Sequence, residues 1–126
     1  MATPESKVKA KIHAILKAQG AYAVNYIGGI AANNGTPDIL ACLHGRFIGI
    51  EAKAGTNTPT AIQLANLKKI DAAGGLALVI NETNLPILRD ILEGAHPQSN
   101  YHLFEKPSKD APTDAPTKRT PKDKND

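Results

Sequence analysis

Two acidic residues and a lysine lie at the ends of neighbouring apolar segments. Asp38 follows Gly35-Thr36-Pro37 directly, and Glu51 and Lys53 come near the end of the next apolar run. Hydrolysis of a phosphodiester needs a hard cation to offset the charge that develops on phosphate, and a group that positions the attacking water. Proteins hold Mg²⁺ in such sites through one or two carboxylates, together with water and substrate oxygens. These three residues are therefore of the types that metal-dependent phosphodiester hydrolysis requires.

The elements expected to position these residues are two strands joined by a tight turn. Residues 38–43 (DILACL) and 47–53 (FIGIEAK) are apolar segments, and the turn at 44–46 (HGR) separates them. Side chains alternate between the two faces of a strand, so Glu51 and Lys53 share one face. In a hairpin that turns at 44–46, Asp38 comes roughly opposite Glu51. The sequence thus predicts that the two carboxylates meet.

The predicted closeness of Asp38 and Glu51 has an electrostatic cost. Two carboxylates about 4 Å apart repel each other by about 4 kcal/mol at an effective dielectric of 20. A bound cation, or protonation of one partner, would relieve this repulsion. The simpler interpretation is a Pro-Asp turn leading into a strand and a solvated Glu-x-Lys at a strand end. The apolar residues around Glu51 favour a buried carboxylate instead.

Two further polar residues interrupt apolar helix faces. Glu5 falls on the same face of an expected first helix as Val8 and Ile12, whereas Lys7 lies on the opposite side. Gln63 lies inside the apolar stripe of an expected second helix. Each residue also has a structural interpretation: Glu5 can interact with the helix dipole in the first turn, and Gln63 can bond to backbone. Their positions at the starts of two helices suggest one shared polar site.

Helical periodicity and turn residues predict the remaining elements. Helices are expected from Thr3-Pro4 to Gly20, from Thr58-Pro59 to Ala73 and from Asn84 to Gly94, and further strands over 21–27 and 76–80. The segment 28–37 (GGIAANNGTP) is expected to be a mobile loop. The order α-β-β-β-α-β-α predicts an α/β fold with a mixed sheet flanked by helices.

The length of 126 residues predicts one domain, over residues 1–104. Residues 105–126 are rich in Pro, Thr and Lys, carry no aliphatic residue larger than alanine, and are expected to form a disordered tail. Cys42 is the one cysteine, which excludes an internal disulfide; its apolar neighbours predict a buried small hydrophobe.

The formal net charge of +3 permits nucleic-acid binding without requiring it. Residues 1–104 contain nine Lys and Arg against seven Asp and Glu, so the expected domain is only mildly basic. No segment approaches the ~20 apolar residues of a membrane span, and the first residues lack the apolar core of a secretory signal. A soluble cytoplasmic protein without membrane contact is expected.

Taken together, these segments resemble the VRR-NUC family, the virus-type replication-repair nuclease branch of the PD-(D/E)XK superfamily. The resemblance rests on G-x-P-D-I at 35–39, on G-R-F-x-x-I-E-x-K at 45–53, on Pro59 and Gln63, and on A-G-G at 73–75 before an apolar strand. It extends over residues 5–92, and the combination is specific although each piece alone is not.

The resemblance implies a restriction-endonuclease-like αβββαβ core, dependence on Mg²⁺ or Mn²⁺, and endonuclease activity on structured DNA. It implies that Asp38 and Glu51 bind the metal, with the Ala52 carbonyl as a third ligand. Lys53 would be catalytic, Glu5 would be the acid of the first helix at the metal, and Gln63 would support them. Small stand-alone members are similar to Holliday-junction resolvases that act as homodimers, and they are typical of phages and bacteria.

Three functions remain open at this point. The first is a dimeric, metal-dependent endonuclease that cuts four-way DNA junctions. The second is a non-catalytic protein that binds structured DNA and retains a nuclease fold. The third is a nuclease that acts on linear or flap DNA; a restriction-type enzyme would show strict sequence preference on linear duplex DNA.

Overall fold

The computed structural model describes residues 3–27, 34–94 and 97–105. Most of the predicted loop at 28–37 and nearly all of the predicted tail at 105–126 lie outside the described residues. The elements follow in the order α1 (Pro4–Ala18), β1 (Tyr22–Asn25), β2 (Ile39–Leu43), β3 (Arg46–Ala52), α2 (Ala61–Ala72), β4 (Leu76–Ile80), the 3₁₀ turn η1 (Leu85–Ile87), α3 (Leu88–Glu93) and the 3₁₀ turn η2 (Tyr101–Phe104).

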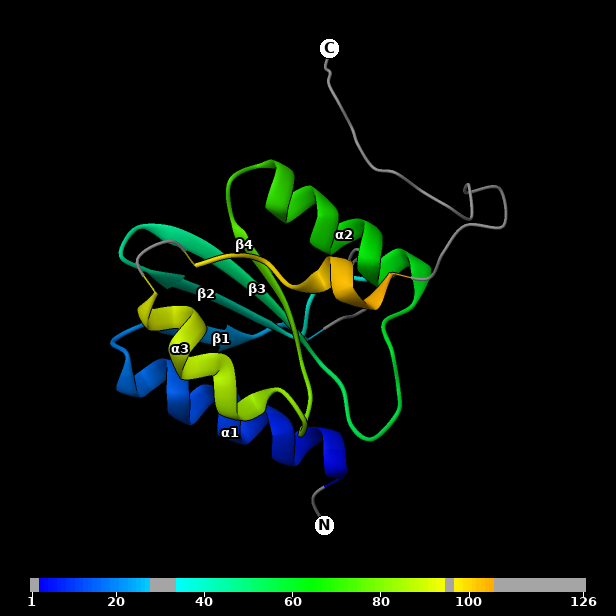
Figure 1. Cartoon of the computed structure of the whole chain (residues 1–126), viewed down its shortest axis with the longest axis horizontal. Helices are drawn as coiled ribbons and strands as arrows, with labels where there is room; N and C mark the ends of the chain where they lie inside the picture. The colour runs from blue at the N-terminus through cyan, green and yellow to red at the C-terminus, as the bar shows by residue number, and fades with distance from the viewer. Residues whose placement is uncertain (1–2, 28–33, 95–96, 106–126) are drawn as a thin grey trace.

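A four-stranded mixed sheet forms the centre of the fold. The strands lie in the order β1-β2-β3-β4; β1–β2 and β2–β3 are antiparallel, whereas β3–β4 is parallel. Helices α1 and α3 cover one face of the sheet, and α2 with η2 covers part of the other (Figure 1). This arrangement confirms the predicted α/β fold with a mixed sheet flanked by helices. Among the described residues, the helices are too short or too polar to span a lipid bilayer.

Alternation along β3 separates two apolar cores. Ile48, Ile50 and Ala52 belong to the larger core, which α1 and α3 complete. The intervening residues of β3 face α2, where the smaller core contains Leu67. Gly49 lies on this second face, and a Cβ atom there would come within 2.6 Å of Ile70 Cδ1. The missing side chain therefore lets α2 pack closely on β3.

The first helix begins as its sequence predicts. Thr3 is the N-cap, its side chain accepts a hydrogen bond from the backbone N–H of Ser6, and Pro4 follows at the first helical position. Gly20, which was expected to end the helix, has φ +85°, a conformation that favours glycine. The cap and the buried face of α1 fix where its first two turns lie relative to the sheet.

The starts of the other two helices differ from the prediction. The N-cap of α2 is Thr60, two residues after the expected Thr58. The expected cap of the last helix, Asn84, has no side-chain capping bond. Its side chain instead accepts a hydrogen bond from Asn81 N at 2.8 Å and donates one to Val79 O at 2.9 Å. These two bonds hold a turn at the end of β4.

The outer edge of β4 is covered by a segment that the sequence did not predict. The Asn100 side chain accepts from Val79 N at 2.7 Å and donates to Val79 O at 3.0 Å. The neighbouring Ser99 hydroxyl accepts from Ala77 N at 2.8 Å. Side chains thus satisfy backbone groups that a fifth strand would otherwise pair.

The prediction that Cys42 is buried is wrong, because Cys42 is exposed. Its cross-strand neighbours are Tyr22 and Phe47, which are 73% and 46% exposed. Helix α2 packs on β3 and β4 and leaves this part of the sheet uncovered (Figure 1). An apolar strand sequence does not reveal how far across the sheet a helix reaches.

Candidate active site

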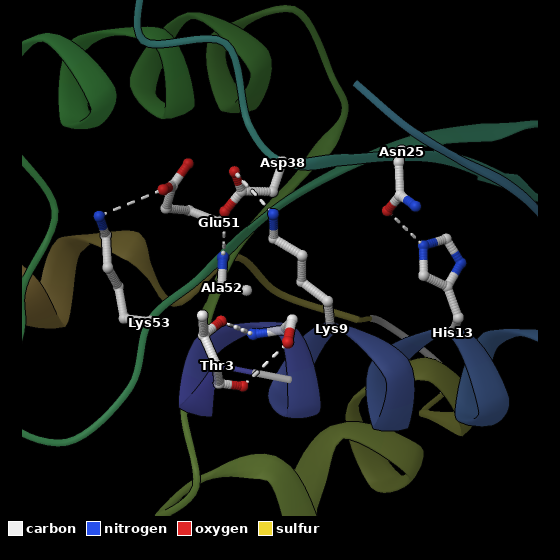
Figure 2. Close-up of polar contacts among 9 residues, drawn as sticks. Thr3, Lys9, His13, Asn25, Asp38, Glu51, Ala52 and Lys53 are labelled. Atoms are coloured by element: carbon white, nitrogen blue, oxygen red, sulfur yellow. Dashed lines mark hydrogen bonds and ion pairs between the residues drawn. The ribbon is translucent and has the colours of Figure 1, made fainter. Parts of the chain in front are cut away.

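Asp38 and Glu51 meet at one end of the sheet, as the hairpin predicts. The last pair of the β2–β3 ladder at that end is Ile39 with Ile50, and Asp38 and Glu51 are the next residues along the two chain segments. Figure 2 shows the two carboxylates next to each other. The backbone N–H of Ala52 donates to Asp38 Oδ2 at 3.0 Å, which holds the Asp38 side chain beside β3.

Glu51 is buried without full satisfaction of its carboxyl group. The residue is 1% exposed, and among the described residues its Oε1 atom has no hydrogen-bond partner. Burial raises the pKa of Glu51 to about 8; the charge of Asp38 adds to the rise, whereas the Lys53 ammonium opposes it. In the absence of a cation, Glu51 is therefore largely protonated at neutral pH.

Lys53 lies on the side of Glu51 away from Asp38 (Figure 2). Its Nζ atom is 3.4 Å from Glu51 Oε2, and its side chain is 13% exposed. The backbone N–H of Lys53 donates to Ile80 O at 3.0 Å, beside the parallel pair of β3 and β4. A long cationic side chain is thus anchored at its base and directed to the carboxylate pair.

The Ala52 carbonyl lies on the Asp38 side of β3. Within a strand, the N–H and C=O of one residue point to the same neighbouring strand. The N–H of Ala52 bonds to Asp38, whereas the next N–H, of Lys53, bonds to β4. The carbonyl is therefore placed on the side where the sequence-based expectation requires a third oxygen ligand.

Lys9 is a site residue that the sequence analysis missed. Its Nζ atom is 3.8 Å from Asp38 Oδ1, and the side chain rises from α1 towards that carboxylate (Figure 2). Lys9 follows Glu5 by four residues and so falls on the sheet-facing side of the helix, unlike the exposed Lys7 and Lys11. That spacing was visible in the sequence, but the pairing depends on how α1 lies on the sheet.

Glu5 lies in the first turn of α1 and is half-buried. In the part of the chain that is described, no three Asp, Glu, His or Cys residues gather where they could hold one metal ion. The structure therefore does not bring Glu5 together with Asp38 and Glu51 as a third ligand. Its place in the first turn agrees with the alternative role, a favourable interaction with the helix dipole.

Gln63 has a capping role in the structure. Its side-chain Oε1 accepts from Thr60 N at 2.8 Å, and its own N–H donates to Thr60 Oγ1 at 3.2 Å. These reciprocal bonds form a capping box at the start of α2. The alternative interpretation, an amide bonded to backbone, is thus confirmed, because the hydrogen bonds of Gln63 join it to Thr60.

The residues present fit a hard divalent cation. Asp38 and Glu51 supply two carboxylates, Ala52 supplies a carbonyl, and the buried Oε1 of Glu51 is an oxygen that still needs a partner. Mg²⁺ sites that act on phosphates commonly use only one or two carboxylates, with water and substrate completing the shell. Two carboxylates are therefore a sufficient protein contribution.

The chain matches no known family model and no curated protein in sequence. The function must therefore be argued from the geometry of the carboxylate pair and its two lysines.

Proposed function

We propose that this protein is a metal-dependent DNA endonuclease that hydrolyses phosphodiester bonds in structured DNA, with the four-way junction as its substrate. One observation carries the proposal: Glu51 is buried with an unpartnered oxygen, between the carboxylate of Asp38 and the ammonium of Lys53. The resemblance to the VRR-NUC family supports the choice of DNA, of a PD-(D/E)XK fold and of a homodimer.

A buried carboxylate at position 51 has no structural advantage for the sheet. The partner of Glu51 on β4, Val79, belongs to the smaller core, which shows that apolar side chains fill this face of the sheet. Burying a carboxyl group with an unpartnered oxygen lowers the stability of the metal-free fold. Natural proteins accept such a cost chiefly at functional sites. The arrangement therefore favours a role that needs two oxygens side by side.

The residues have separate roles in this proposal. Asp38 and Glu51 hold Mg²⁺ or Mn²⁺, and the Ala52 carbonyl is available as a third ligand. The bound cation supplies positive charge that offsets the charge building on phosphate during attack by water. Lys53, which is directed at the carboxylate pair, orients the attacking water or stabilises the charge on phosphate.

Electrostatics of the pair agree with an anionic substrate. When both carboxyl groups are ionised, the ammonium groups of Lys53 and Lys9 balance their negative charge. A divalent cation added to this group leaves an excess of positive charge, which suits a phosphodiester. DNA, with its row of phosphates, presents such a group repeatedly.

The proposal is tested with the purified full chain and a panel of four-way, flap and linear DNA. We expect cleavage of the four-way junction with Mg²⁺ or Mn²⁺ and none with chelator. Asp38→Asn and Glu51→Gln should each lose cleavage by at least roughly 100-fold. Asp90→Asn, which removes an exposed carboxylate on α3, is the matched control and should cut at the wild-type rate.

The same panel distinguishes the other functions. Cleavage by Asp38→Asn at the wild-type rate would overturn the assignment of the site. Tight binding of four-way DNA without cleavage in Mg²⁺, Mn²⁺ or Co²⁺ would support a non-catalytic DNA-binding protein instead. Preferential cleavage of linear or flap DNA would retain the chemistry and change the substrate.

A further inference from the structure

We propose that Lys9 is a phosphate-binding residue of this site: it pairs with Asp38 in the metal-free protein and contacts a backbone phosphate of the DNA once a divalent cation neutralises Asp38. This inference rests on the proposed nuclease function and adds a substrate contact from α1. It starts from the placement of Lys9 on one flank of the carboxylate pair and of Lys53 on the other (Figure 2).

The contact between Lys9 and Asp38 is an ion pair without a hydrogen bond. The distance from Nζ to Oδ1 is 3.8 Å, beyond the range of a good N–H···O bond. The other oxygen of Asp38 already accepts from Ala52 N. A lysine ammonium has three N–H donors, and at this distance Asp38 uses none of them well. The donors of Lys9 are therefore available to a second anion.

Lys9 is placed differently from its neighbours on the same helix. Lys7 and Lys11 are exposed, whereas Lys9 is half-buried and extends from α1 to Asp38 at the start of β2. One-third of its side-chain surface is accessible, so a ligand at the carboxylate pair can reach the ammonium group. A lysine that served only solubility would not need this direction.

The position of Lys9 is fixed by two contacts of α1. The Thr3 cap holds the first turn, and one turn after Lys9 the His13 ring shares a hydrogen bond of 2.7 Å with Asn25 at the end of β1. The backbone N–H of Tyr26, the next residue, donates to Asp38 O at 2.7 Å. Helix α1 and Asp38 are thus tied to the same part of the sheet, which keeps Lys9 beside the pair.

Charge explains why Lys9 would move from Asp38 to phosphate. In the metal-free protein, the Lys9 ammonium pairs with Asp38 at 3.8 Å. When a divalent cation binds the Asp38 carboxylate, Lys9 loses its counter-ion and is repelled by the cation. A phosphate on the Asp38 side relieves this repulsion and accepts a charge-assisted hydrogen bond. Lys53 can meet the same DNA strand from the Glu51 side.

The test uses Lys9→Gln, which removes the charge and retains much of the side-chain length. Lys11→Gln is the matched control, because it removes the same charge from the exposed side of the same helix. Two quantities are measured for each protein: the affinity for Mn²⁺ without DNA, by calorimetry, and the single-turnover cleavage rate on saturating four-way DNA with Mg²⁺. Circular dichroism confirms that each variant is folded.

The two quantities should change in opposite directions for Lys9→Gln. Without its competitor for Asp38, the variant should bind Mn²⁺ more tightly, by roughly two- to fivefold. Without the phosphate contact, its cleavage should slow by on the order of 10- to 100-fold. Lys9→Arg keeps the charge and should recover most of the cleavage rate. Lys11→Gln should leave both quantities within about twofold of the wild type, since exposed charges contribute little.

A merely structural lysine would give a different result. If Lys9→Gln cuts as fast as Lys11→Gln, or if it loses cleavage and Mn²⁺ affinity together, the assignment of Lys9 is wrong while the nuclease function stands. If Lys9→Gln does not fold, Lys9→Arg decides, and a rate as low as that of Asp38→Asn would contradict a phosphate contact. A wild type that cuts no DNA overturns the proposed function, and the role of Lys9 falls with it.

Discussion

The backbone amide of Ala52 donates to the carboxylate of Asp38 across 3.0 Å, so the main chain of β3 holds the side chain that precedes β2. This bond brings Asp38 to Glu51 without any help from a ligand. The two acids are consequently preorganised, and their closeness lowers the stability of the metal-free fold. This destabilisation is the origin of the pH dependence predicted next.

The stability of the metal-free protein should fall as the pH rises from about 4.5 to about 8. The pKa of Glu51 is raised from 4.5 to about 8 by folding, so over this range the native state binds more protons than the unfolded state. The free energy of unfolding then decreases with pH, by at most about 1.4 kcal/mol per pH unit, and levels off above both values. Urea denaturation in chelator at a series of pH values measures it.

Glu51→Gln is the control for this dependence, because glutamine does not titrate. In the variant, the free energy of unfolding should not show the decrease with pH that Glu51 causes. The variant should therefore be more stable than the wild type at pH 8. Added Mg²⁺ should raise the melting temperature of the wild type at pH 8 and leave that of Glu51→Gln nearly unchanged. A wild-type stability that rises steadily between pH 5 and 8 would contradict the burial of an uncompensated carboxyl group.

Gln63 should matter for stability and not for the carboxylate pair. Thr60→Ala removes the oxygen that caps the first turn of α2 and should lower the free energy of unfolding by about 1 kcal/mol. Gln63→Ala removes the reciprocal bond to Thr60 N and should cost a comparable or smaller amount. Neither change should alter Mn²⁺ affinity measured by calorimetry. A Gln63→Ala variant with normal stability and weakened metal binding would show that Gln63 belongs to the site.

Asn100→Ala should destabilise the protein without changing its affinity for Mn²⁺. The change leaves the buried N–H of Val79 without the acceptor that it has now, and such a loss costs about 1–3 kcal/mol. Gln98→Ala, which truncates an exposed amide in the same segment, is the control and should be close to neutral. The measurement is chemical denaturation, together with Mn²⁺ affinity at a temperature where both variants are folded. Equal stability of the two variants would exclude the covering of the β4 edge as a source of stability.

The hairpin and its carboxylate pair could be predicted because local rules decide them. Alternation puts Glu51 on the face of β3 opposite Ile50 and Ala52, and the two-residue turn at His44 and Gly45 fixes its register against Asp38. The fully apolar segment 76–80 likewise predicted a strand, and the structure shows that strand buried in parallel beside β3. In these places the sequence pattern and the final packing agree.

Other features depend on contacts between distant segments, or on a motif that was misinterpreted. Lys9 pairs with Asp38 only because the packing of α1 on the sheet brings Lys9 near the start of β2, and no local pattern encodes that packing. Asn100 covers the β4 edge with a side chain, so its segment lacks the apolar alternation of a strand. Gln63 differs, since Thr60-x-x-Gln63 is a capping-box pattern that can be recognised in the sequence itself.

The exposed position of Cys42 allows site-specific labelling of the protein for spectroscopy. It is the one sulfhydryl in the sequence, and it stands on the uncovered part of the sheet. Asp38 lies four residues earlier in the chain, which corresponds to about 13 Å along an extended strand. A maleimide fluorophore attached there would sit near the carboxylate pair without touching it, and its emission would test in real time whether labelled oligonucleotides bind at the site that we propose for DNA.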